Sequence, residues 1–270
     1  MGSSLWTWVS LAAVLTAAYG FLIEPFWIRP VDYRVWHPDW PADLAGFTIV
    51  QLSDLHGRVQ VFGRADVQRW LSDADLIAVT GDLYSPARRR ARLVAWLARL
   101  PADRTRFVSG NHDYRHRVLD IAPWDPPDGV RLDNRLERYV SPSGRQLWLV
   151  GVPDLGRGRP AWPRPPSNGP AVLLSHRPDA ILAPQARSCH VVLAGHTHGG
   201  QVALPGIGPI LRHSRLPRRQ TTGLVPWPDG RTLVVSRGLG TSELPVRFGA
   251  RPEVVRVLFA PPCPEAQENR

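Results

Sequence analysis

Residues 47–57 read FTIVQLSDLHG, an apolar run that closes on an aspartate and a histidine two positions apart. The apolar run predicts a buried strand, and the polar residues follow directly where that strand ends. Residues 191–200 repeat this arrangement, because VVLA is followed there by GHTHGG. Residues two apart at a strand end can aim at one point, so each pair is able to hold one ligand from one side.

Three more short apolar segments end in polar residues. Residues 76–79 lead into Gly81-Asp82, residues 106–108 into Gly110-Asn111-His112-Asp113, and residues 171–174 into His176. Further strands are expected at 146–152, 231–236 and 253–259, and helices at 63–72, 86–100 and 178–186. Because ligands bind at the carboxyl ends of strands in α/β sheets, the pattern predicts an α/β fold with its polar groups on one rim.

The polar residues at these strand ends are of the types that hold metal ions. Mixed imidazole, carboxylate and carboxamide ligands suit manganese, zinc or iron better than calcium, and we favour manganese. Seven candidates suit two divalent ions if one carboxylate bridges: Asp54, His56, Asp82, Asn111, His176, His196 and His198. Each piece alone is more often a cap, a turn residue or a buried histidine. Their joint order, each after an apolar strand, favours a metal centre.

The order Asp-x-His, Gly-Asp, Gly-Asn-His-Asp, His and Gly-His-x-His resembles that of the calcineurin-like metallophosphoesterase superfamily over about residues 46–260. The runs 195–202, 236–241 and 245–249, with the Glu24-Pro25 step, resemble its bacterial membrane-associated YkuE/YaeI-type branch. That branch includes enzymes that cleave the pyrophosphate of UDP-2,3-diacylglucosamine in lipid A synthesis. The resemblance implies an α/β fold of two packed mixed β-sheets flanked by α-helices.

The resemblance also implies roles for individual residues. One ion would be held by Asp54, His56, Asp82 and His198, and the other by Asp82, Asn111, His176 and His196. His112 would lie beside the scissile phosphate, where it stabilises charge or protonates the leaving oxygen, and Asp113 would orient His112. A metal-activated hydroxide would attack phosphorus in line, without a covalent protein intermediate.

The N-terminus predicts a membrane segment. Residues 5–23 carry no charge, and a helix of that length spans about 28 Å, close to the thickness of a bilayer core. We expect an uncleaved single-pass anchor over residues 1–28, with a cleaved signal peptide as the alternative. Arg29 and Arg34 follow the span, which favours a cytoplasmic catalytic domain. Residues 29–45 are expected to form a tether, 46–260 the metallophosphoesterase domain, and 261–270 a tail.

Composition narrows the class of partner. The chain has 33 basic and 23 acidic residues, a net charge of +10, and every basic residue is arginine. This balance favours phosphorylated substrates, anionic lipids or nucleic acid. The sequence shows no DNA-recognition helix and no aromatic residues interleaved with arginines, so a nucleic-acid partner is not expected. Two cysteines exclude a disulfide framework and a structural zinc finger.

Residues 204–219 combine an apolar stretch with several arginines, directly after the last histidine pair. Arg212 and His213 are candidate substrate contacts there, although an insertion that simply packs on the sheet explains them equally well. The expected substrate is a phosphorylated small molecule, and we favour a lipid-linked one. A broad phosphodiesterase or phosphatase on other envelope or nucleotide substrates is the alternative, and a basic nucleic-acid-binding or scaffold protein the non-enzyme alternative. His37 and His190 lack a partner at useful spacing and receive no role.

Overall fold

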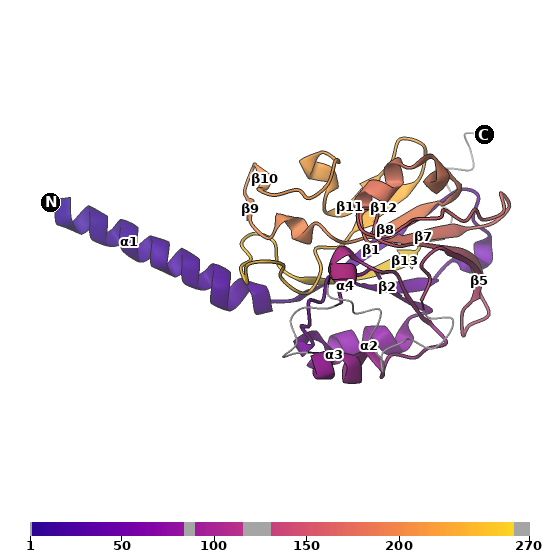
Figure 1. Ribbon diagram of the computed structural model, residues 1–270, viewed down its shortest axis with the longest axis horizontal. Coiled ribbons are helices and arrows are strands. Elements are labelled where there is room, and N and C mark those ends of the chain that lie inside the picture. The colour runs from indigo at the N-terminus through magenta and orange to yellow at the C-terminus, as the bar shows by residue number, and fades with distance from the viewer. Residues whose placement is uncertain (1, 84–89, 116–130, 262–270) are drawn as a thin grey trace.

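A computed structural model describes residues 2–83, 90–115 and 131–261. Two mixed β-sheets pack face to face, helices cover their outer sides, and one long helix projects from the N-terminal end (Figure 1). This is the α/β architecture that the sequence predicts.

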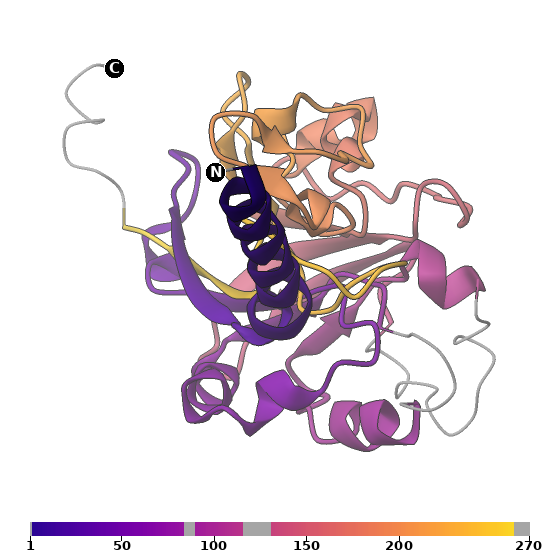
Figure 2. The same cartoon turned by 90° about the vertical axis from the view of Figure 1, so that its left-hand side faces the viewer.

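The projecting helix is α1 (Gly2–Ala18), which continues through a π turn (Tyr19–Ile23) and a 3-10 turn (Glu24–Phe26). The 23 residues Ser4–Phe26 are long and apolar enough to cross a membrane. Its large side chains are exposed, among them Trp6 and Trp8, as suits lipid contact rather than a protein core. Figure 2 looks onto the N-terminal end of this helix. Just beyond α1, Tyr19 and Glu24 line a hollow together with the β9–β10 segment (Ala203–Leu204 and Gly208–Pro209).

The first sheet has five strands. Their order is β1 (Arg29–Val35), β13 (Glu253–Phe259), β2 (Thr48–Leu52), β3 (Leu76–Val79) and β4 (Thr105–Phe107). Strands β2, β3 and β4 are parallel, whereas β13 runs antiparallel to β2. The carboxyl ends of β2, β3 and β4 therefore meet at one edge.

The second sheet has six strands. Their order is β11 (Gly223–Pro226), β12 (Thr232–Val235), β8 (Val191–Ala194), β7 (Ala171–Ser175), β6 (Gln146–Val152) and β5 (Arg135–Val140). The four middle strands are parallel and the two edge strands antiparallel. The central strands β7 and β8 are buried on both faces, which explains their uninterrupted apolar runs.

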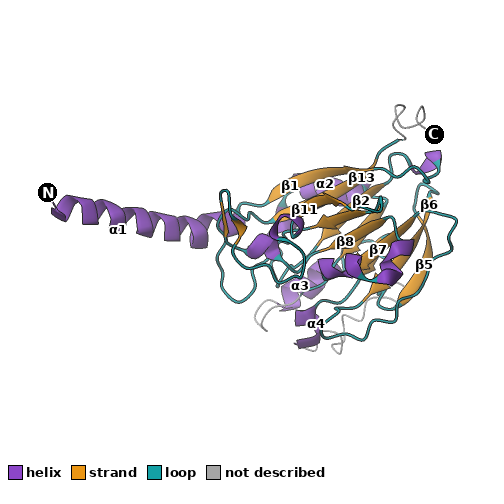
Figure 3. Ribbon diagram, turned by 90° about the horizontal axis from the view of Figure 1, so that it is seen from above, coloured by secondary structure: helices purple, strands orange, loops and turns teal. Residues whose placement is uncertain are grey.

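The main core lies between the two sheets (Figure 3). Phe47, Ile49 and Val257 from the first sheet meet Leu149 and Leu174 from the second, and all five are buried. Each such side chain contributes about 1.5–3 kcal/mol when it leaves water. Helices α2 (Ala65–Asp73) and α3 (Arg90–Leu97) cover the outer face of the first sheet.

The segment predicted as a tether contains strand β1. Residues 29–35 pair with β13 along their whole length, so this part of the chain belongs to the first sheet. Val31, Tyr33 and Val35 point to the more buried side, and this period of two is a strand signal that the surrounding prolines and tryptophans obscured. An edge strand tolerates Pro30, because one side of its backbone needs no partner. The other domain boundaries remain a prediction.

The predicted helix over 178–186 is wrong. Two 3-10 turns occupy the segment, Pro178–Leu182 and Pro184–Ser188, and Ala183 between them is extended. Pro184 explains the break, since proline disfavours helical backbone at the residue before it. The helix predicted over 86–100 is represented by α3, and residues 84–89 lie outside the described part of the chain.

Candidate metal centre

All seven predicted metal ligands come together at one rim of the two sheets. Asp54 and His56 follow β2, Asp82 follows β3, and Asn111 begins the short helix α4 (Asn111–Arg115) after β4. His176 follows β7, and the loop after β8 carries His196 and His198. The parallel strands of both sheets thus deliver their carboxyl-terminal loops to one place.

The first group consists of Asp54, His56 and His198, which are buried. The Nε2 atom of His198 lies 3.3 Å from Oδ1 of Asp54 and 3.2 Å from Nε2 of His56. Burial raises the pKa of Asp54 to about 6, because the carboxylate has lost water without gaining a full counter-charge. A cation between these three side chains would supply that charge.

The second group surrounds Nε2 of His176. Nδ1 of His196 and Oδ1 of Asn111 each lie 3.1 Å from it, and Oδ2 of Asp82 lies 3.3 Å away. Nδ1 of His176 is 2.8 Å from the carbonyl oxygen of Thr80, which can only accept, so this nitrogen carries a proton and Nε2 faces the group. Burial opposes a charge on His176, yet Asp82 raises its pKa to about 10. The carboxylate of Asp82 therefore favours a positive charge at this position, which a proton on His176 supplies when no metal ion is bound.

Asp82 joins the two groups. Its Oδ2 atom is 3.3 Å from Nε2 of His176 and 3.7 Å from Nε2 of His56. Burial opposes ionisation of Asp82, but His176 and His56 outweigh it and hold its pKa well below the usual range. A carboxylate that stays ionised between two sets of imidazoles has the chemistry of a bridging ligand, and the donor set fits two divalent ions.

The backbone of this rim is strained. Asp54, His56, Asp82, His196 and His198 all have positive φ, between 45° and 69°. Such conformations cost on the order of 1–3 kcal/mol each and persist where the surroundings enforce them, commonly at functional sites. Five of the seven predicted ligands are thus held in conformations that a chain selected only for stability avoids.

Two glycines let backbone approach the carboxylates. A Cβ on Gly195 would lie 1.9 Å from Oγ of Ser53 and 2.3 Å from Oδ2 of Asp54. A Cβ on Gly110 would lie 2.3 Å from Oδ1 of Asp82. Only glycine fits at either position, which explains the Gly-His and Gly-Asn steps in the sequence.

His112 lies next to both groups. Its ring packs edge-on against His56 with centroids 4.8 Å apart, and its backbone N–H donates to Oδ1 of Asp82 at 2.7 Å. The predicted role of Asp113, to orient His112, stays a prediction, and the structure adds contacts of Asp113 to the backbone. The Asp113 carboxylate accepts the backbone N–H groups of Asp82, Leu83 and Gly110, so it holds the Asp82 loop against α4.

A hollow of about 500 Å³ opens over the centre. His213 lines its mouth, with its ring 6.1 Å from that of His196, whereas the exposed Arg212 is not among the lining residues. Sequence reasoning missed the three arginines of the wall, Arg115, Arg157 and Arg177. Arg177 directly follows His176, and this adjacency was the available signal. A second hollow of about 620 Å³ shares Arg177 and His213 with the first and includes Trp162.

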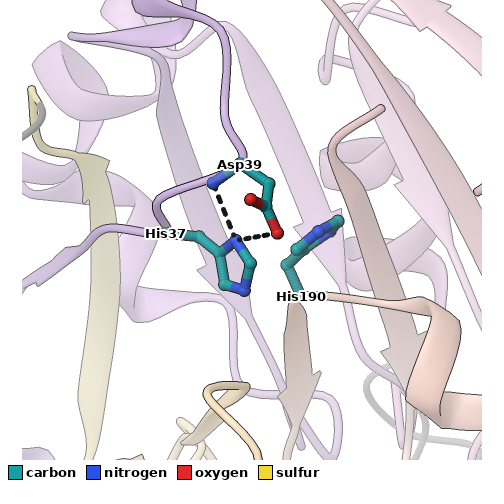
Figure 4. A group of neighbouring side chains, drawn as sticks. All are labelled: His37, Asp39 and His190. Atoms are coloured by element: carbon teal, nitrogen blue, oxygen red, sulfur yellow. Dashed lines mark hydrogen bonds and ion pairs between the residues drawn. The ribbon is translucent and has the colours of Figure 1, made fainter. Parts of the chain in front are cut away.

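Another imidazole–carboxylate group lies at the opposite rim (Figure 4). It consists of His37 and Asp39, which follow β1, and His190, which precedes β8. Nδ1 of His37 accepts the backbone N–H of Asp39, and Nδ1 of His190 accepts that of Ala171. Because each Nδ1 lone pair is used, each neutral ring carries its proton on Nε2, which suits a structural role.

Comparison with known proteins points to one family. The model of the calcineurin-like phosphoesterase family matches residues 47–200. Uncharacterized metallophosphoesterase YkuE of Bacillus subtilis is 29% identical over 263 residues, covering 90% of this chain and 91% of its own length. Phosphodiesterase YaeI of Escherichia coli is 28% identical over 267 residues, covering 90% and 94%. Transmembrane protein with metallophosphoesterase domain of Danio rerio is 27% identical over 278 residues, covering 92% and 62%.

Proposed function

The chain belongs to the calcineurin-like phosphoesterase family, and from this premise we propose that it hydrolyses a phosphodiester or pyrophosphate bond in a substrate presented at a membrane surface. The observation that carries the proposal is the Asp82 carboxylate, which faces His176 on one side and His56 on the other. Two ion sites that share one carboxylate are the arrangement that clamps a phosphoryl group.

We assign the ligands as the family pattern suggests. One ion would be held by Asp54, His56, Asp82 and His198, and the other by Asp82, Asn111, His176 and His196. When bound, the two ions polarise the phosphoryl group and supply a nucleophilic hydroxide near neutral pH. Manganese is the proposed metal, because the oxygen donors of Asp54, Asp82 and Asn111 suit it beside the imidazoles.

The side chains around the two ion sites bind the phosphate group of the substrate and protonate its leaving oxygen. His112 lines the hollow beside Asp82 and is the proposed donor of a proton to the leaving oxygen. Arg115, Arg157 and Arg177 offer charged N–H groups to the remaining phosphate oxygens. Asp113 keeps the Asp82 loop and α4 in register through its backbone contacts.

Apolar side chains near the anchor support a substrate presented by a membrane. Ile207, Ile210, Leu211 and Leu244 are all exposed, and Leu211 and Leu244 also line the hollow over the metal centre. The β9–β10 segment that carries Ile207 in its turn shares a hollow with Tyr19 and Glu24, just beyond the end of α1. An apolar wall that joins a membrane-facing surface to a phosphate site suits an amphiphilic phosphoester.

The finer proposal is hydrolysis of the pyrophosphate of UDP-2,3-diacylglucosamine in lipid A synthesis. The branch motifs, the anchor and the apolar wall support it. A cytoplasmic catalytic domain would fit this substrate, and Arg29 and Arg34, which closely follow the span, support that orientation. We propose no nucleic-acid partner.

A second candidate is a phosphodiesterase of broad specificity. The relative YaeI is named a phosphodiesterase and aligns with 90% of this chain, which favours this candidate. The hollow is open to solvent beside its arginines, so a small diester could also enter.

The deciding experiment uses the full chain purified in detergent, stripped of metal and reloaded with Mn²⁺. Hydrolysis of UDP-2,3-diacylglucosamine, followed as UMP release, is compared with hydrolysis of bis(p-nitrophenyl) phosphate, and His112→Ala is the control. Metal-dependent UMP release that the variant loses supports the lipid substrate. Turnover of the simple diester alone leaves the broad phosphodiesterase, and no turnover of either with Mn²⁺, Zn²⁺ or Fe²⁺ rejects the proposal.

A further inference from the structure

The segment between the membrane helix and strand β1 is built into the body. Glu24 is 1% exposed although its side chain is polar, and it lies near the end of the apolar span. Its Oε1 accepts the backbone N–H of Ala250 at 2.6 Å, and its Oε2 accepts that of Gly249 at 2.9 Å. A buried carboxylate is costly unless it is hydrogen-bonded, so these two bonds commit Glu24 to the loop around residue 249. We call residues 19–27 the junction.

The same loop carries a buried arginine. Arg247 is fully buried, and its backbone N–H donates to the carbonyl of Gly20 in the junction at 2.9 Å. Its guanidinium donates to carbonyl oxygens: those of Arg237, Gly238, Gly240, Ala250 and His198. Nη2 also lies 3.4 Å from Nδ1 of His198. A guanidinium has five N–H groups in a rigid fork, so one side chain ties several segments together.

The segments that Arg247 ties together support the first metal group. The backbone N–H of Gly240 donates to the carbonyl of Asp54 at 2.6 Å, and that of Leu239 donates to Ser53 at 3.0 Å. A Cβ on Gly238 would lie 2.5 Å from Cβ of Asp54, so the loop packs directly on that residue. Through the loop Arg247 supports Asp54, and through its own contacts it supports His198.

A second connection runs from the junction to His56. Arg58 lies two residues after His56, and its Nη1 donates to the carbonyl of Pro25 at 2.7 Å. Its guanidinium also lies over the ring of Phe26, 4.8 Å from the centroid. The loop of His56 and the 237–240 loop are therefore both held against the junction.

We infer that the junction, acting through Glu24 and Arg247, is a positioning element of the ion site formed by Asp54, His56 and His198. The membrane segment is then more than a tether, because retention of one ion depends on how the chain leaves the membrane helix. The inference rests on the proposed function in one respect, namely that these side chains hold an ion.

The test measures ion binding as well as activity. The full chain in detergent, freed of metal, is titrated with Mn²⁺ against a fluorescent chelator, and its thermal unfolding is recorded without metal. Glu24→Gln keeps the size of the side chain but replaces one acceptor with a donor, so one backbone N–H loses its partner. We expect binding of one Mn²⁺ to weaken about tenfold while the other is unchanged, as for other residues that orient ligands. Excess Mn²⁺ should restore kcat.

Asp75→Asn is the matched control. Asp75 is also a buried carboxylate, and it accepts the backbone N–H of Thr48 and pairs with Arg145 before β3, away from the metal rim. This variant should lower the unfolding temperature and leave both Mn²⁺ affinities unchanged. Arg58→Gln, which frees the Pro25 carbonyl, is the milder second variant and should weaken the same Mn²⁺ less than Glu24→Gln does.

Two results would overturn the inference. If Glu24→Gln and Arg58→Gln fold and bind both Mn²⁺ ions as the unaltered chain does, the junction is structural only. If Glu24→Gln does not fold, unchanged binding by Arg58→Gln decides against the inference in the same way. An unaltered chain that binds no Mn²⁺ would instead overturn the proposed function and the inference with it.

Discussion

Within the described part of the chain, imidazoles and carboxylates gather at both ends of the sheets. The metal rim gathers His56, His176, His196 and His198 around two aspartates, and the opposite rim holds His37 and His190 beside Asp39. Both groups bring ring nitrogens and carboxylate oxygens within ligand distance of one another. Residue types and distances alone therefore do not show which of the two rims binds metal ions.

The backbone separates the two groups. At the metal rim the Thr80 carbonyl accepts a hydrogen bond from Nδ1–H of His176, so that the other ring nitrogen faces Asp82 and Asn111. At the opposite rim backbone N–H groups donate to Nδ1 of His37 and of His190, so the lone pairs of these two nitrogens are already used in hydrogen bonds. A carbonyl that accepts a hydrogen bond from one ring nitrogen fixes the proton there and leaves the lone pair of the other nitrogen for a cation. A backbone N–H that donates to a ring nitrogen instead uses the lone pair that a cation would need.

The largest expected effect comes from Asp82→Ala. The variant should lose both ions and reduce hydrolysis about 10³-fold or more, because metal ions contribute several kcal/mol of transition-state stabilisation. Elemental analysis and hydrolysis of bis(p-nitrophenyl) phosphate measure the two losses. His190→Ala should keep both ions. Retention of two ions by Asp82→Ala would show that the carboxylate does not bridge, and the comparison of the rims would lose its basis.

His112→Ala tests whether His112 is a proton donor or a further metal ligand. His112 also lies within ligand distance of His56 and Asp82. A proton donor should lower kcat about 10²- to 10⁴-fold when removed and leave the metal content intact. The loss should be smaller for esters with a good leaving group, such as p-nitrophenol, because they need less help from an acid. Loss of one ion in this variant would make His112 a ligand.

Arg157→Met tests the arginines that line the hollow over the metal rim. Arg157 is exposed in the wall of the hollow, and Arg159, two residues along, is also exposed but outside the lining. Removing a charged hydrogen bond to phosphate should lower kcat/KM about tenfold for Arg157→Met. Arg159→Met should leave the rate constant as it is. Equal effects of the two substitutions would mean that only general surface charge matters.

The smallest effect concerns pH at the opposite rim. Burial, and then the charge of His37, lowers the pKa of His190 from 6.5 to about 4. The unfolded chain thus takes up a proton that the folded chain refuses, so stability should fall as pH drops from 6.5 toward 4. His190→Gln should flatten this fall by about 1 kcal/mol, allowing for solvent screening. Thermal unfolding of both chains without metal, at pH 7 and pH 4.5, measures the difference, and identical slopes would contradict the assigned role of His190.

Much of the fold was readable from local pattern. The strands at 146–152 and 253–259 have the predicted bounds, because each is an apolar run bordered by turn residues. Strand β1 is not predicted from the sequence, because the alternation of Val31, Tyr33 and Val35 lies among prolines and tryptophans that favour an irregular segment. The helix predicted over 178–186 rests on apolar spacing, which does not take account of the break that Pro184 causes between the two 3-10 turns.

The site was readable to the extent that its chemistry is local. Asp54-x-His56 and His196-x-His198 announce ligands by type and spacing, and the order of the strands places them on one rim. His176 follows a buried strand whereas His190 precedes one, so their order along the chain already places them at opposite rims. Asp113 sits beside His112 in the chain, and only the structure shows that its carboxylate also holds the backbone of Asp82 and Leu83.

The sequence by itself determined the class of the protein: an apolar N-terminal span, an α/β fold with polar loops at one rim, and a donor set suited to two divalent ions. Only the tertiary structure decided which ring nitrogen of His176, His37 and His190 is engaged by the backbone, and that Glu24 and Arg247 join the membrane segment to the rim. The physical reason is range. Burial periodicity and residue type act within one strand or turn, whereas the contacts between Glu24 and Ala250, or between Thr80 and His176, join residues far apart in the chain.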